Sequence, residues 1–145
     1  MNIKIGNMWS CFDETNHFLI TTNAIVKADG CLVMGRGIAK QCRDKFANID
    51  FAMGRAVQKA SFAYGIILGA KIGLFQVKYH WQDDAKIELI KMSADMLSVY
   101  ARKNPNKRID LNFPGIGNGK LAKQYDEVLE TISVLPDNVN VWKYK

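Results

Sequence analysis

The sequence is poor in cysteine, in proline and in long apolar runs, and the first and last of these shortages each exclude a class of protein. Its 145 residues include three cysteines and three prolines. The cysteines are odd in number and lack CxxC or Cys/His spacing, so we expect reduced thiols in a cytoplasmic protein rather than a disulfide framework or a zinc site. No apolar run approaches the roughly 18 residues of a membrane helix, and we expect no signal peptide.

The remaining composition is that of an ordinary globular chain. Hydrophobic residues make up 48% and charged residues 23% of the sequence. The length predicts a single domain over residues 1–145. The formal net charge of +6 favours an anionic partner such as a nucleotide or a nucleic acid, although proteins that bind neither also have this charge.

Strand-like and helix-like segments alternate along the chain. Strands are predicted over 1–5, 17–23, 108–113 and 139–144, with one or two more within 65–77. Four helices are predicted: one with Ala39, Cys42 and Phe46 on its face, one capped by Asp50, a long one that starts at Asp83 or Asp84, and one with Tyr125, Val128, Leu129 and Ile132. This alternation predicts a three-layer α/β/α sandwich with a mixed, largely parallel sheet.

Two glycine-rich segments, "MGRGIA" (34–39) and "FPGIGNG" (113–119), follow predicted strands. Ligands of such sheets bind beyond the carboxyl ends of the strands, where backbone N–H groups can hold a diphosphate. The first segment lacks the third glycine of the dinucleotide fingerprint. The second has Pro114 and Leu121 where a P-loop needs glycine and a hydroxyl. Each segment could also be a plain strand-to-helix turn.

Five segments in order resemble the macrodomain family, whose members bind ADP-ribose. They are "KIGNMWS" (4–10), "TTNA" (21–24), "MGRGIA", "FQVKYHW" (75–81) and "FPGIGNG". The fourth resembles the branch that contains the DNA ADP-ribosyl glycohydrolase antitoxins and the glutamate-ADP-ribose hydrolases. The resemblance implies the macrodomain fold and ADP-ribose as ligand. We expect no cofactor, and no metal, because the sequence offers no proper set of metal ligands.

The resemblance also implies a set of ligand-binding residues. The family's Gly-Asp turn, which accepts hydrogen bonds from the adenine amino group, is Gly6-Asn7 here, and the Asn7 oxygen can still accept. Asn23 matches an asparagine near the distal ribose, but a second asparagine is replaced by Val26. The implied ligand-binding set comprises Asn7, Met8, Asn23, Ala24, Met34, Gly35, Gly37, Ile38, Ala39, Gly115, Ile116, Gly117, Asn118, Gly119 and Lys120.

Lys78 is the implied catalytic residue, because that branch places a lysine here that acts on the anomeric carbon of the distal ribose. A lysine amine can act as a nucleophile when it is neutral, and a charged one could only position or stabilise. The alternative is that Lys78 is a surface residue at a strand end. His80 and Trp81 are expected to anchor this loop. The glutamate-ADP-ribose hydrolases place an aspartate in the second glycine loop, which this chain lacks; Asp29, Asp83 and Asp84 are the possible substitutes.

Several functions are compatible with these residues. The first is hydrolysis of ADP-ribose from a modified protein, nucleic acid or metabolite. The others are a non-catalytic ADP-ribose reader, a phosphatase acting on ADP-ribose-1''-phosphate, and a nucleic-acid-binding module that rests on net charge alone. We expect a monomer with no membrane partner.

Overall fold

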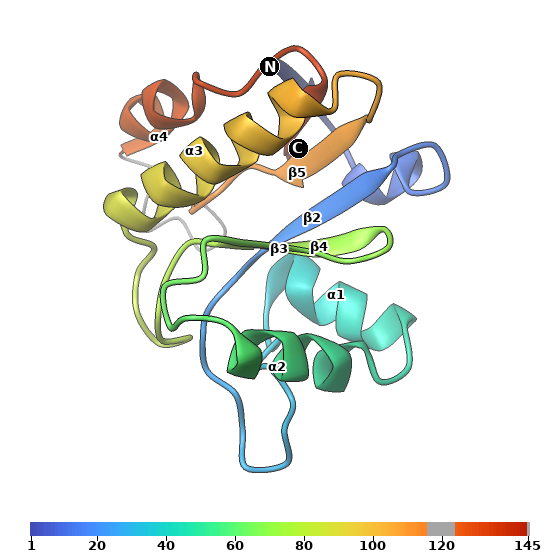
Figure 1. Ribbon diagram of the computed structural model, residues 1–145, viewed down its shortest axis with the longest axis vertical. Coiled ribbons are helices and arrows are strands. Elements are labelled where there is room, and N and C mark those ends of the chain that lie inside the picture. Colours follow the sequence, from blue (N-terminus) through green and yellow to red (C-terminus); the bar gives the residue numbers. More distant parts are fainter. Residues whose placement is uncertain (116–123, 145) are drawn as a thin grey trace.

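The computed structural model describes residues 1–115 and 124–144 and contains a six-stranded sheet (Figure 1). The strands are β1 (Asn2–Ile5), β2 (His17–Thr22), β3 (Ile66–Leu68), β4 (Ile72–Gln76), β5 (Ile109–Asn112) and β6 (Val139–Lys143). Their order is β1-β6-β5-β2-β4-β3, and every pairing is parallel except the antiparallel pair of β3 and β4. This confirms the mixed, largely parallel sheet.

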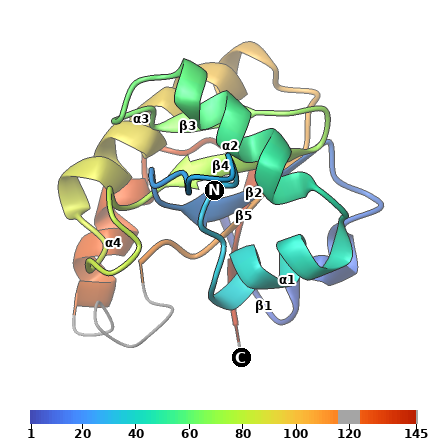
Figure 2. The ribbon, with the colours of Figure 1, turned by 90° about the horizontal axis from the view of Figure 1, so that it is seen from below.

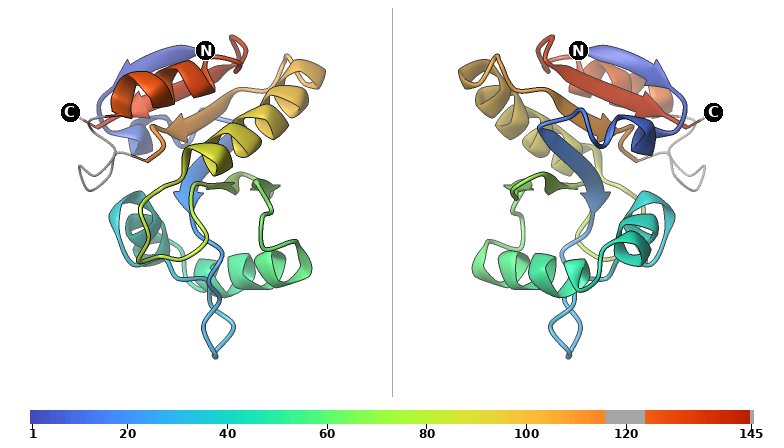
Figure 3. Two further views of the ribbon diagram at one scale, coloured as in Figure 1. Left: turned by 90° about the vertical axis from the view of Figure 1, so that its left-hand side faces the viewer. Right: turned by 90° about the vertical axis from the view of Figure 1, so that its right-hand side faces the viewer.

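Helices cover both faces of the sheet. They are α1 (Gly37–Lys45), α2 (Ile49–Lys59), α3 (Ile87–Lys103) and α4 (Tyr125–Ile132), and a short 3-10 helix, η1 (Met8–Cys11), follows β1. Seen from below, α1 and α2 lie in front of the sheet (Figure 2), and the side views place the sheet between this pair and α3 with α4 (Figure 3). The three-layer prediction is therefore confirmed. None of the helices in the described ranges has the length and apolar character needed to cross a bilayer.

The central strands bury both of their faces, which explains their nearly continuous apolar sequence. In β2, Leu19 packs into the core under α3 and α4, whereas Phe18 and Ile20 pack into the core under α1 and α2. In β4, Phe75 packs into the core under α3 and α4, and Leu74 packs into the core under α1 and α2. Two separate cores hold the layers together, and the carboxyl ends of β2 and β5 meet between them.

Two helix starts differ from the prediction. The second helix begins at Ile49 after Asn48, so Asp50 lies in its first turn, where its carboxylate accepts the N–H of Phe51. The long helix begins at Ile87, after both Asp83 and Asp84. The segment before it folds back on the sheet, because the N–H of Lys86 donates to the carbonyl of Val77. These backbone contacts delay the helix beyond either aspartate.

Candidate functional site: a cavity at the carboxyl ends of β2 and β5

The connections that leave β2 and β5 run to opposite faces of the sheet. The chain leaving β2 continues to α1 and α2, and the chain leaving β5 continues to α4 on the other face. The two strands are neighbours, so their carboxyl ends form a topological switch point. Open α/β sheets bind ligands in the crevice at such a point.

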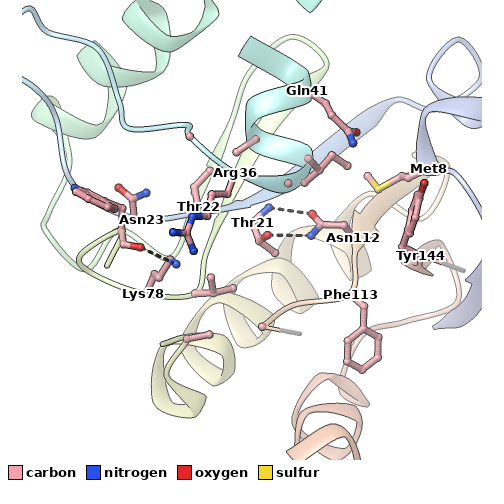
Figure 4. Close-up of a pocket in the computed structure, with 18 of the residues that line it drawn as sticks. Met8, Thr21, Thr22, Asn23, Arg36, Gln41, Lys78, Asn112, Phe113 and Tyr144 are labelled. Atoms are coloured by element: carbon pink, nitrogen blue, oxygen red, sulfur yellow. Dashed lines mark hydrogen bonds between the residues drawn. The ribbon is translucent and has the colours of Figure 1, made fainter. Parts of the chain in front are cut away.

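An amide side chain joins the two strands where they separate. The backbone pairing of β2 with β5 ends at Leu19 and Leu111. Beyond it, the N–H of Thr21 donates to Oδ1 of Asn112 at 3.0 Å, and Nδ2 of Asn112 donates to Oγ1 of Thr21 at 2.9 Å (Figure 4). The Asn112 side chain thus replaces the backbone ladder and leaves space above it.

That space is a cavity of about 790 Å³, within the usual range for small-molecule sites. Its walls come from segments far apart in the sequence. Among the described residues it is lined by Gly6, Asn7, Met8, Trp9, Thr21, Thr22, Asn23, Val33, Gly35, Arg36, Gly37, Ile38, Ala39, Gln41, Val77, Lys78, Trp81, Gln82, Asp83, Asp84, Ala85, Asn112, Phe113, Gly115, Trp142 and Tyr144.

The first glycine segment opens the N-terminus of α1 into this cavity. Gly37, the first residue of α1, has a φ of 55°, a conformation that favours glycine. Arg36 precedes it without a side-chain cap, and the first turn has no acidic residue. The first N–H groups of the helix and its partial positive charge therefore remain available to an anion.

The second glycine segment is described only as far as Gly115, which lines the cavity. The other predicted residues of this loop, Ile116, Gly117, Asn118, Gly119 and Lys120, lie outside the described residues.

The predicted base-binding turn has a structural task of its own. Oδ1 of Asn7 accepts the backbone N–H of Trp9 at 3.1 Å and so caps η1. Asn7 and the buried Met8 both line the cavity. The side-chain oxygen of Asn7 is thus shared with η1 rather than reserved for a ligand.

Asn23 is tied into the backbone around it. Its Nδ2 donates to the carbonyl of Val33 at 3.0 Å, and its Oδ1 accepts the N–H of Ile25 at 2.9 Å. It joins the end of β2 to the segment before α1 while lining the cavity. Ala24 and Met34, also predicted as ligand-binding, are buried behind this junction and do not line the cavity; they support its wall from the core.

Lys78 stands at the rim of the cavity and is fixed by the loop that follows it. Its Nζ donates to the backbone carbonyls of Trp81 at 3.1 Å and of Asp83 at 3.2 Å. The ring of His80 stacks on Trp81, and its Nδ1 accepts the N–H of Gln82. These contacts agree with an anchoring role for His80 and Trp81.

The three candidate carboxylates lie in different places. Asp83 and Asp84 line the cavity. Asp29 lies in the tight turn between Lys27 and Cys31, where its carboxylate accepts the N–H of Cys31. It is not among the lining residues. Only the first two are therefore positioned to act on a ligand.

Several lining residues were not predicted to bind a ligand: Thr22, Gln41, Asn112, Trp142 and Tyr144. Trp142 is held by Asp110, a fully buried carboxylate that accepts its indole N–H at 2.8 Å and Nε of Arg108 at 2.9 Å. Burial acts to raise the pKa of Asp110, but the hydrogen bonds from Trp142 and Arg108 outweigh it and hold the pKa below its usual value. An ionised Asp110 thus fixes one wall of the cavity.

Comparison with known proteins places this architecture among solved structures. No protein-family model and no curated protein matches the chain. The macrodomain of Thermus aquaticus DarG matches with a TM-score of 0.77 at 24% identity, over 99% of this chain and 97% of that one. A Thermosipho africanus DarTG in complex with ADP-ribose matches with a TM-score of 0.70 at 18% identity, over 100% of this chain and 42% of that one.

The macrodomain of Mycobacterium tuberculosis DarG also matches, with a TM-score of 0.60 at 20% identity, over 97% of this chain and 96% of that one. These likenesses extend over nearly the whole chain. The chain therefore has the macrodomain fold.

Proposed function

We propose that the protein binds ADP-ribose in the cavity between β2 and β5. The observation that carries this proposal is the uncapped N-terminus of α1, which opens into a cavity of about 790 Å³ at the switch point of a macrodomain fold. The Thermosipho DarTG that was solved in complex with ADP-ribose shares this fold over 42% of its chain and supports the choice of ligand.

The diphosphate would lie against the first glycine segment. Among the described residues, a Cβ added at Gly35 or Gly37 would meet nothing within 4 Å, so the missing side chains leave space beside the helix N-terminus. Arg36 and Lys78 line the same cavity and add positive charge. An anion with two phosphate groups matches both the N–H groups and this charge.

The two ends of the cavity suit the two ends of ADP-ribose. Met8 and Tyr144 lie at one end (Figure 4), and Trp9 and Trp142 also line the cavity; these flat or apolar side chains suit a nucleobase. Asn23 and Lys78 lie at the other side of the Thr21–Asn112 joint (Figure 4) and would face the distal ribose.

Calorimetry and thermal unfolding test the binding. At about 100 times Kd, ADP-ribose should stabilise the fold by about 2.7 kcal/mol. This corresponds to a rise in Tm of roughly 5–10 °C for a chain of this size. ADP should act weakly and ribose 5-phosphate hardly at all. The proposal would be contradicted if millimolar ADP-ribose produced no heat of binding and no shift in Tm.

We further propose that the protein hydrolyses ADP-ribose conjugates at the anomeric carbon of the distal ribose. Support comes from the grouping of Lys78 with Asp83 and Asp84 on one rim of the cavity, since such hydrolysis needs a group at the anomeric centre and an acid or base. The substrate would be an ADP-ribosylated protein or nucleic acid.

A panel of substrates tests the hydrolysis. Glutamate-linked protein, thymidine-linked DNA and ADP-ribose-1''-phosphate are incubated with the purified protein, and released ADP-ribose is measured. Release from either linked substrate supports the hydrolase. Release from the phosphate alone identifies a phosphatase. Binding of ADP-ribose without release from any substrate identifies a reader.

A further inference from the structure

A buried amide lies two residues before Lys78. Gln76 is the last residue of β4, and its side chain is fully buried. Its Oε1 accepts the backbone N–H of Gly65 at 3.0 Å, and its Nε2 donates to the carbonyl of Phe62 at 2.9 Å and to that of Lys78 at 3.3 Å. One N–H group and two carbonyl groups can pair with an amide in one orientation only, so the direction of this side chain is fixed.

The three hydrogen bonds join two separate connections of the fold. Phe62 and Gly65 belong to the connection between α2 and β3, and Lys78 belongs to the connection between β4 and α3. The ring of Phe62 also stacks on that of Tyr79, with 5.0 Å between centroids and 12° between planes. The backbone at Lys78 is therefore held from the segment that follows α2 as well as from β4.

The same connection after α2 holds a second residue that we propose to face the distal ribose. The hydroxyl of Tyr64 donates to the backbone carbonyl of Asn23 at 2.7 Å, and the backbone N–H of Ala24 donates to the carbonyl of Tyr79 at 2.8 Å. Asn23 and Lys78 thus belong to one hydrogen-bonded network, and both line the cavity (Figure 4). Enzymes depend on such fixed spacing, because a displacement of about 1 Å can lower a rate about a hundredfold.

The bond to Lys78 differs in its consequence from the other two. The bonds to Gly65 and Phe62 stabilise the connection after α2. The bond to the carbonyl of Lys78 restrains the peptide unit at this residue, and with it the direction in which the side chain leaves the backbone. The ammonium end of that side chain is held separately by the carbonyls of Trp81 and Asp83. Lys78 is therefore held at both ends.

We propose that Gln76 is a positioning residue for hydrolysis, which holds Lys78 at the anomeric carbon of the distal ribose. This inference rests on the proposed hydrolase function. Gln76 is not among the described residues that line the cavity, so it acts through the backbone of Lys78 and not by contact with the substrate. Its loss should lower turnover and leave the affinity for ADP-ribose nearly unchanged.

Two variants test the inference by single-turnover hydrolysis and calorimetry. Gln76→Met keeps the length of the side chain but removes all three hydrogen bonds. Gln76→Glu keeps an acceptor for Gly65 and can donate at most one hydrogen. On the linked substrate that the parent cleaves, Gln76→Met should lower the rate at least about tenfold and Gln76→Glu at least about threefold. The Kd for ADP-ribose should change less than about threefold in both.

Ser98→Ala is the matched control for stability. The hydroxyl of Ser98 is buried on α3 outside the cavity and donates to the carbonyl of Val134 at 3.0 Å. Its loss also removes a buried hydrogen bond, so this variant should lower Tm without lowering the rate. All rates are measured well below the Tm of each variant.

The outcomes separate this inference from the proposals on which it rests. A parent that binds ADP-ribose but releases none from any substrate overturns the hydrolase proposal and the inference together. Parent-like rates in both Gln76 variants overturn the inference alone. An equal loss of rate in Ser98→Ala, or failure of both Gln76 variants to fold, also overturns it, because either result assigns Gln76 to stability only.

Discussion

The substitution Gly54→Ala should destabilise the protein, although alanine favours helices. Gly54 lies in the middle of α2, where the helix backbone contacts the segment that connects β2 to α1. A Cβ at this position would overlap the carbonyl oxygen of Gly30 and would lie 2.9 Å from the backbone nitrogen of Leu32. These are backbone atoms, which cannot rotate away as a side chain can.

The size of the effect follows from two opposing contributions. Overpacking of this kind costs about 1–3 kcal/mol, and contact with two backbone groups places it in the upper part of that range. Replacing glycine by alanine within a helix returns about 1 kcal/mol. We expect a net loss of about 1–2 kcal/mol, which corresponds to roughly 3–7 °C in Tm.

Urea unfolding followed by circular dichroism measures this loss, with Ala52→Gly as the matched control. Ala52 is exposed on the same helix, so this variant reports the helix propensity alone, with an expected loss of about 1 kcal/mol. Adding the two losses isolates the steric contribution. A Gly54→Ala protein as stable as the parent would refute the close approach of α2 to Gly30.

Three further predictions concern the site and the pH dependence. Gly37→Val should lower ADP-ribose affinity more than tenfold, because the branched side chain fills the space beside the α1 N-terminus; parent-like affinity in calorimetry would place the diphosphate elsewhere. Lys78→Ala should abolish most turnover with little change in affinity for the product ADP-ribose, and Lys78→Arg should not restore the turnover. Full activity in Lys78→Ala would assign the chemistry to another group. Burial and the charge of Lys107 lower the pKa of His17, so the unfolded chain binds more protons and stability should fall as pH drops below about 6.5. Urea titrations between about pH 5 and 7.5 should show a smaller fall in stability for His17→Gln than for the parent. An equal fall would exclude His17 as its cause.

The fold could be predicted from the sequence because its signals are local. The spacing of Ala39 and Cys42 predicts the buried face of α1. The apolar run of β2 predicts a strand that is buried on both faces. The start of α3 could not be predicted, because Asp84 is a plausible cap until the contact of Lys86 with Val77 is known. That contact joins residues of different elements, and local propensity does not encode it.

The site was predictable only where glycine loops or family motifs mark it. Gly37 and Lys78, which lie in such segments, line the cavity, and their roles toward a ligand stay predictions. Gln41 and Trp142 carry no motif, because they reach the cavity through the packing of α1 and β6 against η1 and β5. Asn7 lines the cavity, and its binding role stays a prediction; the direction of its amide depends on Trp9, which only the folded chain places.

The side-chain joint between Thr21 and Asn112 makes one backbone amide a reporter of local opening. The N–H of Thr21 is protected by a rotatable carboxamide, whereas the amide of Phe18 donates to the backbone carbonyl of Lys71. Hydrogen exchange at the Thr21 amide therefore requires only rotation of the Asn112 side chain, not separation of two strands. Thr21 should exchange faster than the interior of β2, and a ligand that seals the crevice above it should slow that exchange without affecting the rest of the strand.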